Sequence, residues 1–229
     1  MMQEISAYWD RQSVIWREEK QDAWSQPVTQ QWLTYFKELL PRLKGNRVLE
    51  AGTASGYFAN ILALAGYEVT AADISANMIA EAKAVSAALN VRVDYHVMDA
   101  QQLDFPEHHF DLVFTRLMTW TIPDVNTFYG ECFKVLKPGG LLLNFDGDFG
   151  ACQFSQEGHE KYPADIMEQA NRIKSRLDIS KYQRPAKDIA VLQAAGFVQV
   201  SAGEREDQVQ QQPEGTSDLF ELKGYKPLH

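Results

Sequence analysis

The fold is decided by a short apolar run that leads into a loop with two glycines, Val48-Leu49-Glu50-Ala51-Gly52-Thr53-Ala54-Ser55-Gly56. The apolar run predicts a strand over 47–51, and apolar residues recur at helical spacing over 58–65, directly after the loop. A glycine at a sharp strand-to-helix turn lets the backbone come close to a ligand. Taken alone, the loop is equally compatible with a tight turn that binds nothing.

Strand-like and helix-like runs alternate along the rest of the chain. Further strands are expected at 68–72, 91–97, 110–115 and 141–145, the last of them after a turn at 137–140. Helices are expected at 27–40, 78–89, 125–136, 163–177 and 188–195. The strands at 197–202 and 219–225 lie too close together for a helical crossover and should pair antiparallel. The sequence therefore predicts a doubly wound, mostly parallel seven-stranded α/β sheet with a C-terminal antiparallel hairpin and helices on both faces.

Composition and charge narrow the class of protein. The 229 residues are 45% hydrophobic and 23% charged, as in a globular domain, and the formal net charge of -9 disfavours nucleic-acid partners. No run approaches the roughly 20 apolar residues of a membrane-spanning helix. The charged N-terminus does not resemble a signal peptide, and Cys132 and Cys152 lack metal-ligand spacing. We expect a cytoplasmic protein with reduced thiols and no metal.

The residues of the glycine loop can be compared with those of three kinds of nucleotide-binding site. A phosphate-binding P-loop requires Gly-Lys-Ser/Thr where this chain has Tyr57-Phe58. The dinucleotide pattern G-x-G-x-x-G requires glycine at the positions of Ala54 and Tyr57, and the bulk of Tyr57 obstructs approach of a pyrophosphate. S-adenosylmethionine carries no phosphate, so its loop needs only close backbone approach, and Glu50 can serve its charged amino-acid end.

These residues resemble the first motif of the class I S-adenosylmethionine-dependent methyltransferases, in particular the small-molecule type with the methyltransferase domain 11 pattern. Only Ala54 departs from that motif, in place of its middle glycine, and the extra methyl is tolerable if position 54 keeps a negative φ. The resemblance extends over 47–145 and includes 135–141, Val-Leu-Lys-Pro-Gly-Gly-Leu, which is similar to the family's turn before the fifth strand.

The resemblance also implies the cofactor contacts. It assigns Asp73 to the ribose hydroxyls, Ile74 and Met78 to the adenine ring, and Asp99-Ala100 to the adenine edge. The full predicted set of cofactor residues is Glu50, Gly52, Thr53, Gly56, Asp73, Ile74, Met78, Asp99, Ala100 and Thr115. Two structural alternatives stay open: Asp73 helps Ser75 cap the next helix, and Asp99 belongs to a solvated turn.

The acceptor site of this family lies above the carboxyl ends of the fourth and fifth strands. That placement, together with the aromatic N-terminal segment, predicts the substrate residues Tyr8, Trp16, Arg116, Trp120, Asp146 and Asp148. The alternatives are a core aromatic for Trp120 and a solvated charge for Arg116. His108 and His109 precede the fourth strand, so they should be exposed and outside the site.

We expect one domain over 1–229. It divides into an N-terminal lid at 1–26, a cofactor-binding core at 27–148, an inserted lid or substrate segment at 149–184, and a C-terminal helix and hairpin at 185–229. The resemblance implies in-line transfer of a methyl group from S-adenosylmethionine to a small molecule, leaving S-adenosylhomocysteine. We expect no nucleic-acid or membrane partner, leave a homodimer open, and identify no catalytic base. The alternatives are an S-adenosylmethionine-binding protein without transferase activity, a methyltransferase acting on RNA or protein, and an NAD-dependent oxidoreductase.

Overall fold

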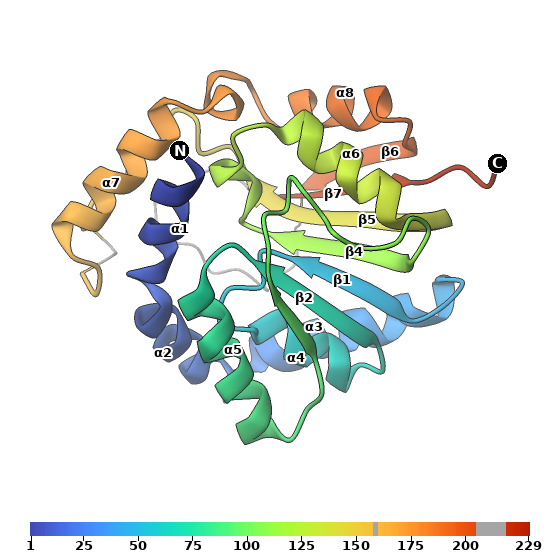
Figure 1. Cartoon of the computed structure of the whole chain (residues 1–229), viewed down its shortest axis with the longest axis horizontal. Coiled ribbons are helices and arrows are strands. Elements are labelled where there is room, and N and C mark those ends of the chain that lie inside the picture. Colours follow the sequence, from blue (N-terminus) through green and yellow to red (C-terminus); the bar gives the residue numbers. More distant parts are fainter. Residues whose placement is uncertain (158–159, 205–218) are drawn as a thin grey trace.

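A seven-stranded sheet forms the centre of the computed structural model, which describes residues 1–157, 160–204 and 219–229 (Figure 1). The strand order is β3-β2-β1-β4-β5-β7-β6. The strands are β1 (Arg47–Ala51), β2 (Glu68–Asp73), β3 (Asp94–Val97), β4 (Phe110–Arg116), β5 (Leu136–Gly147), β6 (Val198–Glu204) and β7 (Leu219–Tyr225). The predicted fold class is confirmed.

Neighbouring strands from β3 to β5 pair in parallel, and β7 pairs antiparallel with both β5 and β6. The C-terminal hairpin is therefore present as predicted. The carboxyl ends of β1 to β5 meet at one edge of the sheet, because strands joined by helical crossovers run in the same direction. This edge gathers the residues that follow each strand.

The helices agree with the predicted periodicity from residue 27 onward. They are α1 (Met2–Asp10), α2 (Ser13–Ala23), α3 (Pro27–Leu39), α4 (Tyr57–Leu64), α5 (Ala76–Leu89), α6 (Val125–Val135), α7 (Ala164–Ser175) and α8 (Ala186–Ala194), with short 3₁₀ turns η1 (Leu40–Arg42), η2 (Thr119–Thr121) and η3 (Asp178–Lys181). Ser75 caps α5, as predicted, because its hydroxyl accepts from the Met78 amide at 3.0 Å.

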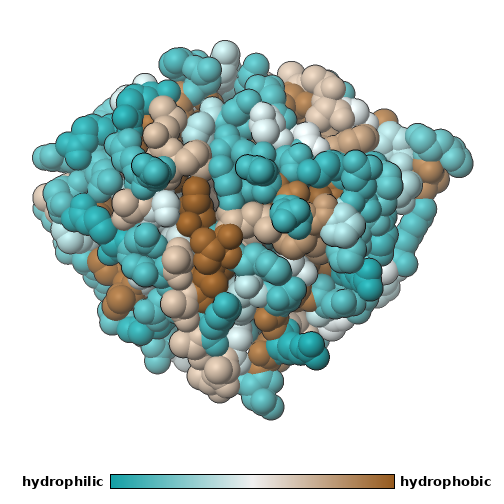
Figure 2. Space-filling view, in the orientation of Figure 1, coloured by the Kyte–Doolittle hydropathy of each residue, from teal (hydrophilic) through white to brown (hydrophobic). Residues whose placement is uncertain are grey.

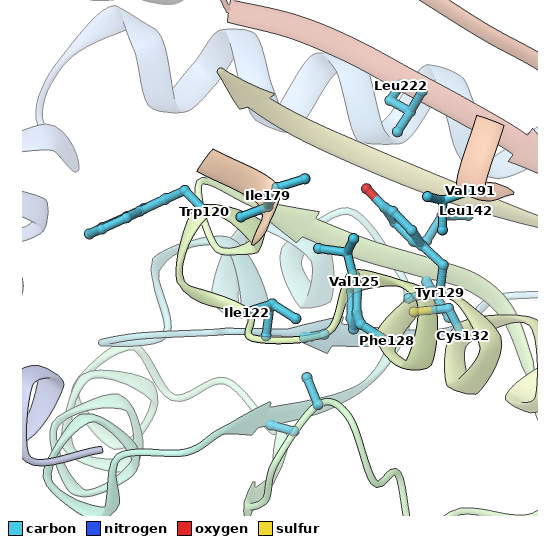
Figure 3. Packing of buried hydrophobic residues seen from close by; sticks show 14 of the residues in the cluster. Trp120, Ile122, Val125, Phe128, Tyr129, Cys132, Leu142, Ile179, Val191 and Leu222 are labelled. Carbon is cyan, nitrogen blue, oxygen red and sulfur yellow. The ribbon is translucent and has the colours of Figure 1, made fainter. Parts of the chain in front are cut away.

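Both faces of the sheet are covered by helices. One face packs against α3 and α4 around Trp32 and Phe36, and the other packs against α6 and α8, while α7 lies beside α1 beyond the carboxyl ends of the strands (Figure 1). Figure 3 shows Tyr129 and Cys132 of α6 close to Leu142 of β5 and to Val191 of α8. Burial of these apolar side chains is the main stabilisation of the fold.

The two N-terminal helices, α1 and α2, were not predicted. Short helices are marginal in isolation and depend on an apolar face packed against the rest of the protein. In α1, Ile5 and Tyr8 are buried, at 2% and 3% exposure. Ser6 Oγ donates to the Ile74 carbonyl at 3.2 Å, and Ser75 Oγ donates to Asp10 Oδ1 at 2.6 Å. Tertiary contacts therefore fix α1 against the loop that follows β2.

The predicted turn at 137–140 is also wrong in detail, because β5 begins at Leu136 and includes it. Phe110 pairs with Leu136, the register then shifts, and Leu112 pairs with Leu141. The Gly139 amide donates to the Lys226 carbonyl, and the Lys226 amide donates to the Gly140 carbonyl. These two hydrogen bonds hold Gly139 and Gly140 against the chain that follows β7.

Residues 158–159 of the predicted inserted segment at 149–184, and residues 205–218 of the predicted C-terminal segment at 185–229, lie outside the described residues. Among the helices that the structure does describe, none combines the length and apolar character needed to cross a bilayer.

Candidate active site

A cavity lies at the carboxyl ends of β1 to β4, where the loops after these strands meet. Its floor comes from the loops after the strands: Gly52, Ala54, Asp73, Ile74, Met78, Met98, Asp99 and Ala100. Its other walls come from α1, α2 and the segment after β4: Met2, Ile5, Trp9, Trp16, Arg116, Leu117, Met118, Thr121 and Ile122. Figure 2 shows a hydrophobic strip near the middle of an otherwise mostly hydrophilic face, over the region where α1 approaches α5.

The two loop glycines serve different purposes. Gly52 has φ +75°, and a Cβ there would overlap the side chain of Met118, which also lines the cavity. Gly56 has φ +80° and lies away from the cavity, where a Cβ would come within 2.6 Å of Tyr95 Oη and 2.9 Å of Ala82 Cβ. Gly52 keeps the cavity open, whereas Gly56 lets α4 pack against α5 and β3.

Ala54 does not have the negative φ that was the condition for tolerating its methyl group; its φ is +47°. The left-handed conformation costs an alanine about 1–2 kcal/mol. It aims the Ala54 amide at Asp73, whose Oδ2 accepts at 2.9 Å. The loop is thus tied to the end of β2, and this tie opposes the local preference of alanine.

Asp73 lies at the cavity floor and is almost completely buried, with 9% exposure. Its second oxygen, Oδ1, accepts from the Ser75 amide at 2.9 Å. Burial raises the pKa of Asp73 to about 6, Asp10 adds to the rise, and the hydrogen bonds from Ser75 and Ala54 oppose it. A carboxylate offers about four acceptor sites, so about two remain for a ligand. Asp73 therefore both orients the start of α5 and presents acceptors to the cavity.

The other predicted residues at this end of the cavity are placed together. Ile74, Met78, Asp99 and Ala100 all line it. Asp99 accepts from the Gln101 amide at 2.9 Å, which fixes its carboxylate in the turn after β3. The arrangement is an apolar slot with a carboxylate at each of two neighbouring strand ends.

Three predicted cofactor residues, Glu50, Thr53 and Thr115, are buried and do not line the cavity, and Gly56 is likewise absent from its lining. Glu50 is 2% exposed, and its Oε2 accepts from Thr53 Oγ1 at 2.6 Å. Burial raises the pKa of Glu50 to about 8, and the Thr53 hydrogen bond opposes that rise. Thr115 is fully buried, and its hydroxyl has no hydrogen-bond partner among the described residues. None of these three side chains lines the cavity, so their contacts with the cofactor stay predictions.

The predicted substrate residues divide into two groups. Arg116 and Trp16 line the cavity. Tyr8 and Trp120 belong to the core cluster instead, and both pack edge-on against Trp9, with ring centroids 5.0 and 5.8 Å away. Trp120 thus follows its structural alternative, and both rings support the cavity wall from behind.

Asp146 and Asp148 were predicted at the cavity mouth, and the structure places both away from it. Asp146 is fully buried and pairs with Arg184 at 3.4 Å, and its Oδ2 also accepts from the Thr119 hydroxyl. Asp148 Oδ2 accepts from the Arg184 amide at 3.1 Å. Asp188 is the third carboxylate here, 2.8 Å from Arg184 Nε. A buried guanidinium requires such partners, so these aspartates stabilise the loop after β5.

Several cavity residues were not predicted. Met2, Ile5 and Trp9 of α1 lie at positions i, i+3 and i+7, and this spacing was the available signal of a helix with one apolar face. Met98, Leu117, Met118 and Ile122 lie in loops and Thr121 ends the short turn η2, and these segments carry no such period.

His108 and His109 lie at the opposite end of the sheet, before β4, as expected; His108 is exposed and His109 is half-buried. No cluster of three or more His, Cys, Asp or Glu side chains suited to a metal occurs within residues 1–157, 160–204 and 219–229.

Comparison with known proteins agrees with this geometry. A family model described as a methyltransferase domain matches residues 49–144. A ubiquinone biosynthesis O-methyltransferase from Bradyrhizobium sp. (strain ORS 278) is 34% identical over 101 residues, which are 44% of this chain and 40% of that protein. Phosphoethanolamine N-methyltransferase 1 from Zea mays is 29% identical over 81% of this chain and 35% of its own. The matches span less than half the length of these curated relatives.

Solved structures share the fold. Phosphoethanolamine N-methyltransferase 2 from Haemonchus contortus, in complex with S-adenosyl-L-methionine, has a TM-score of 0.65 at 20% identity over 86% of this chain and 52% of its own. A putative methyltransferase bound to the Haloferax volcanii Trm112 activator has a TM-score of 0.64 at 19% identity, over 96% of this chain and 97% of its own.

The fold and the matched segment define a protein built around a methyltransferase domain. Residues 49–144 match the methyltransferase domain, and the fold is one that solved methyltransferases share.

Proposed function

We propose that this chain transfers a methyl group from S-adenosylmethionine to a small-molecule acceptor. The observation that carries the proposal is the cavity itself, in which Asp73 and Asp99 follow neighbouring strands beside the open backbone of Gly52. This pattern of paired acceptors and close backbone approach suits a nucleoside without phosphates.

The residues present fit that cofactor. The remaining acceptors of Asp73 suit the ribose hydroxyls, and Asp99 suits the exocyclic amine of adenine. Ile74 and Met78 supply apolar surface for the ring. Because Gly52 has no side chain, the loop backbone is accessible to a ligand at a position where a Cβ would overlap Met118.

S-adenosylmethionine, when bound, supplies an electrophilic methyl group, so the protein mainly has to position an acceptor and exclude water. The side chains of Met2, Ile5 and Trp9 form an apolar wall of α1 over the cavity. Asp10 fastens that helix to Ser75 at 2.6 Å and to the Asn77 amide at 3.1 Å. We assign residues 1–26 a role as a lid over the cofactor.

The acceptor would lie toward β4, between Arg116, Trp16 and Thr121. The named relatives that methylate phosphoethanolamine, or act in ubiquinone biosynthesis, support a small molecule as the acceptor rather than RNA or protein. The net charge of -9 supports the same choice.

The test is thermal unfolding of the full chain with S-adenosylmethionine, S-adenosylhomocysteine or NAD, followed by mass spectrometry of a panel of small acceptors. The first two ligands should raise the unfolding temperature, because a ligand that binds only the folded form stabilises it, and NAD should not. No shift with either methionine derivative contradicts the proposed cofactor. A shift without methylation of any acceptor favours a binding protein without transferase activity.

A further inference from the structure

Charge is distributed unevenly along the cavity. The carboxylates of Asp73 and Asp99 lie at the ends of β2 and β3, whereas Arg116 is the last residue of β4, on the far side of β1. If the cofactor occupies the acidic end, as we propose above, the acceptor faces the basic end.

A second cation stands beside Arg116. Lys20 of α2 places Nζ 5.4 Å from the ring centroid of Trp16, which lines the cavity, and 5.6 Å from that of Tyr57. Lys20 makes no hydrogen bond or ion pair with any residue in the described parts of the chain.

Aromatic rings connect the two cations. The guanidinium carbon of Arg116 is 5.3 Å from the centroid of Phe58, and the rings of Phe58 and Tyr57 lie 5.0 Å apart. Tyr57 is itself held by a hydrogen bond of 2.7 Å between its hydroxyl and Thr29 Oγ1. The ring of Tyr57, whose size argues against a dinucleotide, therefore packs against the ammonium group of Lys20.

We propose that Lys20 and Arg116 together bind an anionic group of the methyl acceptor, a carboxylate or a phosphate ester carried on an apolar body. This inference rests on the proposed function, because it assigns the basic end of the same cavity to the acceptor. Trp16 and Trp9 supply the apolar surface for that body.

Electrostatics supports the assignment. Burial lowers the pKa of Lys20 to about 8, and the nearby charge of Arg116 lowers it further, against a smaller opposing effect of Glu19. Burial leaves the Lys20 ammonium group poorly solvated, and an anion beside it would stabilise its charged form. Charge-assisted hydrogen bonds from both side chains would then fix the acceptor's orientation.

The experiment is calorimetric titration of the full chain saturated with S-adenosylhomocysteine. The probes are phenylacetate and phenyl phosphate, with phenylacetamide and benzyl alcohol as neutral counterparts. We expect at least one of the anions to bind about tenfold or more tightly than its neutral counterpart, the size of a charge-assisted hydrogen bond. Preference for phenylacetate indicates a carboxylate acceptor, and preference for phenyl phosphate indicates a phosphate ester.

Variants separate this site from general charge effects. Lys20→Met should weaken binding of the preferred anion about tenfold or more, and Lys20→Arg should restore most of it. Lys187→Met is the matched control, because Lys187 also stands over a tyrosine, with Nζ 4.4 Å from the Tyr182 centroid, but away from the cavity. S-adenosylhomocysteine affinity reports whether each variant keeps its fold.

The outcomes distinguish the two proposals. Failure of S-adenosylhomocysteine to bind overturns the proposed function and this inference with it. Binding of S-adenosylhomocysteine with equal affinity for anions and neutral probes overturns this inference alone. An anion affinity that Lys20→Met leaves unchanged also overturns it.

Discussion

The substitution Glu50→Gln tests the buried carboxyl group beneath the glycine loop. Glu50 is almost completely buried, and burial raises its pKa from the reference value of 4.5 to about 8. At neutral pH the folded protein therefore holds a proton on Glu50 that the unfolded chain has released. The folded form binds more protons, so its stability falls as pH rises.

The structure sets the magnitude of this effect. The difference between 4.5 and about 8 corresponds to as much as about 5 kcal/mol, at about 1.36 kcal/mol per pKa unit. The contribution is complete below the unfolded pKa, near 4.5, and is lost as pH rises to about 8. The pKa of Asp73 is also raised, to about 6, so Asp73 likewise lowers the stability of the folded protein as pH rises from about 4 to about 6. Glutamine cannot ionise, so Glu50→Gln removes the dependence that arises from position 50.

The assay is urea unfolding of the ligand-free chain at pH 5, 7 and 9. The free energy of unfolding of Glu50→Gln, relative to wild type, should increase by about 2–5 kcal/mol between pH 5 and pH 9. Glu38→Gln, on an exposed position of α3, is the matched control and should follow wild type. A constant difference between Glu50→Gln and wild type across this range would show that Glu50 is ionised in the folded protein.

Three further predictions concern Asp73, Ala54 and the buried ion pairs of Arg184. Asp73→Ala should weaken S-adenosylhomocysteine binding by about 1–3 kcal/mol in calorimetry, because it removes charge-assisted hydrogen bonds, and an unchanged dissociation constant would show that the ribose is misplaced. Ala54→Gly should raise the free energy of unfolding by about 1 kcal/mol, because glycine adopts the φ of +47° without strain. The control Ala80→Gly, at an exposed position of α5, should lower the free energy of unfolding by about 1 kcal/mol. A lower free energy of unfolding for both variants argues against strain at Ala54. Arg184→Met should cost about 3–5 kcal/mol in urea unfolding by leaving buried carboxylates unpaired, and a cost below about 1 kcal/mol would mean that the cluster is unimportant for stability.

The core of the fold could be predicted because its local signals agree with its tertiary packing. Apolar runs mark β1, β2, β4 and β5, and the capping residue Ser75 marks the start of α5. Asp73 ends β2 and Asp99 lies two residues after β3, and both were correctly placed at one edge, since parallel strands end together.

Other features depend on contacts between distant parts of the chain. The helical spacing of Met2, Ile5 and Trp9 was present in the sequence, but only the packing of α1 against α5 and the rest of the fold stabilises that helix. Asp146 looked like a site residue because it ends β5, and nothing local indicates that Arg184, 38 residues later, neutralises it. The positive φ of Ala54 likewise depends on its hydrogen bond to Asp73.

The central claim is that the cavity at the carboxyl ends of β1 to β4 binds S-adenosylmethionine. Calorimetric titration of the purified full chain with S-adenosylhomocysteine, repeated in the presence of excess NAD, tests it most directly. The account predicts saturable binding at one site per chain that NAD does not displace and that Asp73→Ala weakens. Absence of binding, or displacement by NAD, would contradict it.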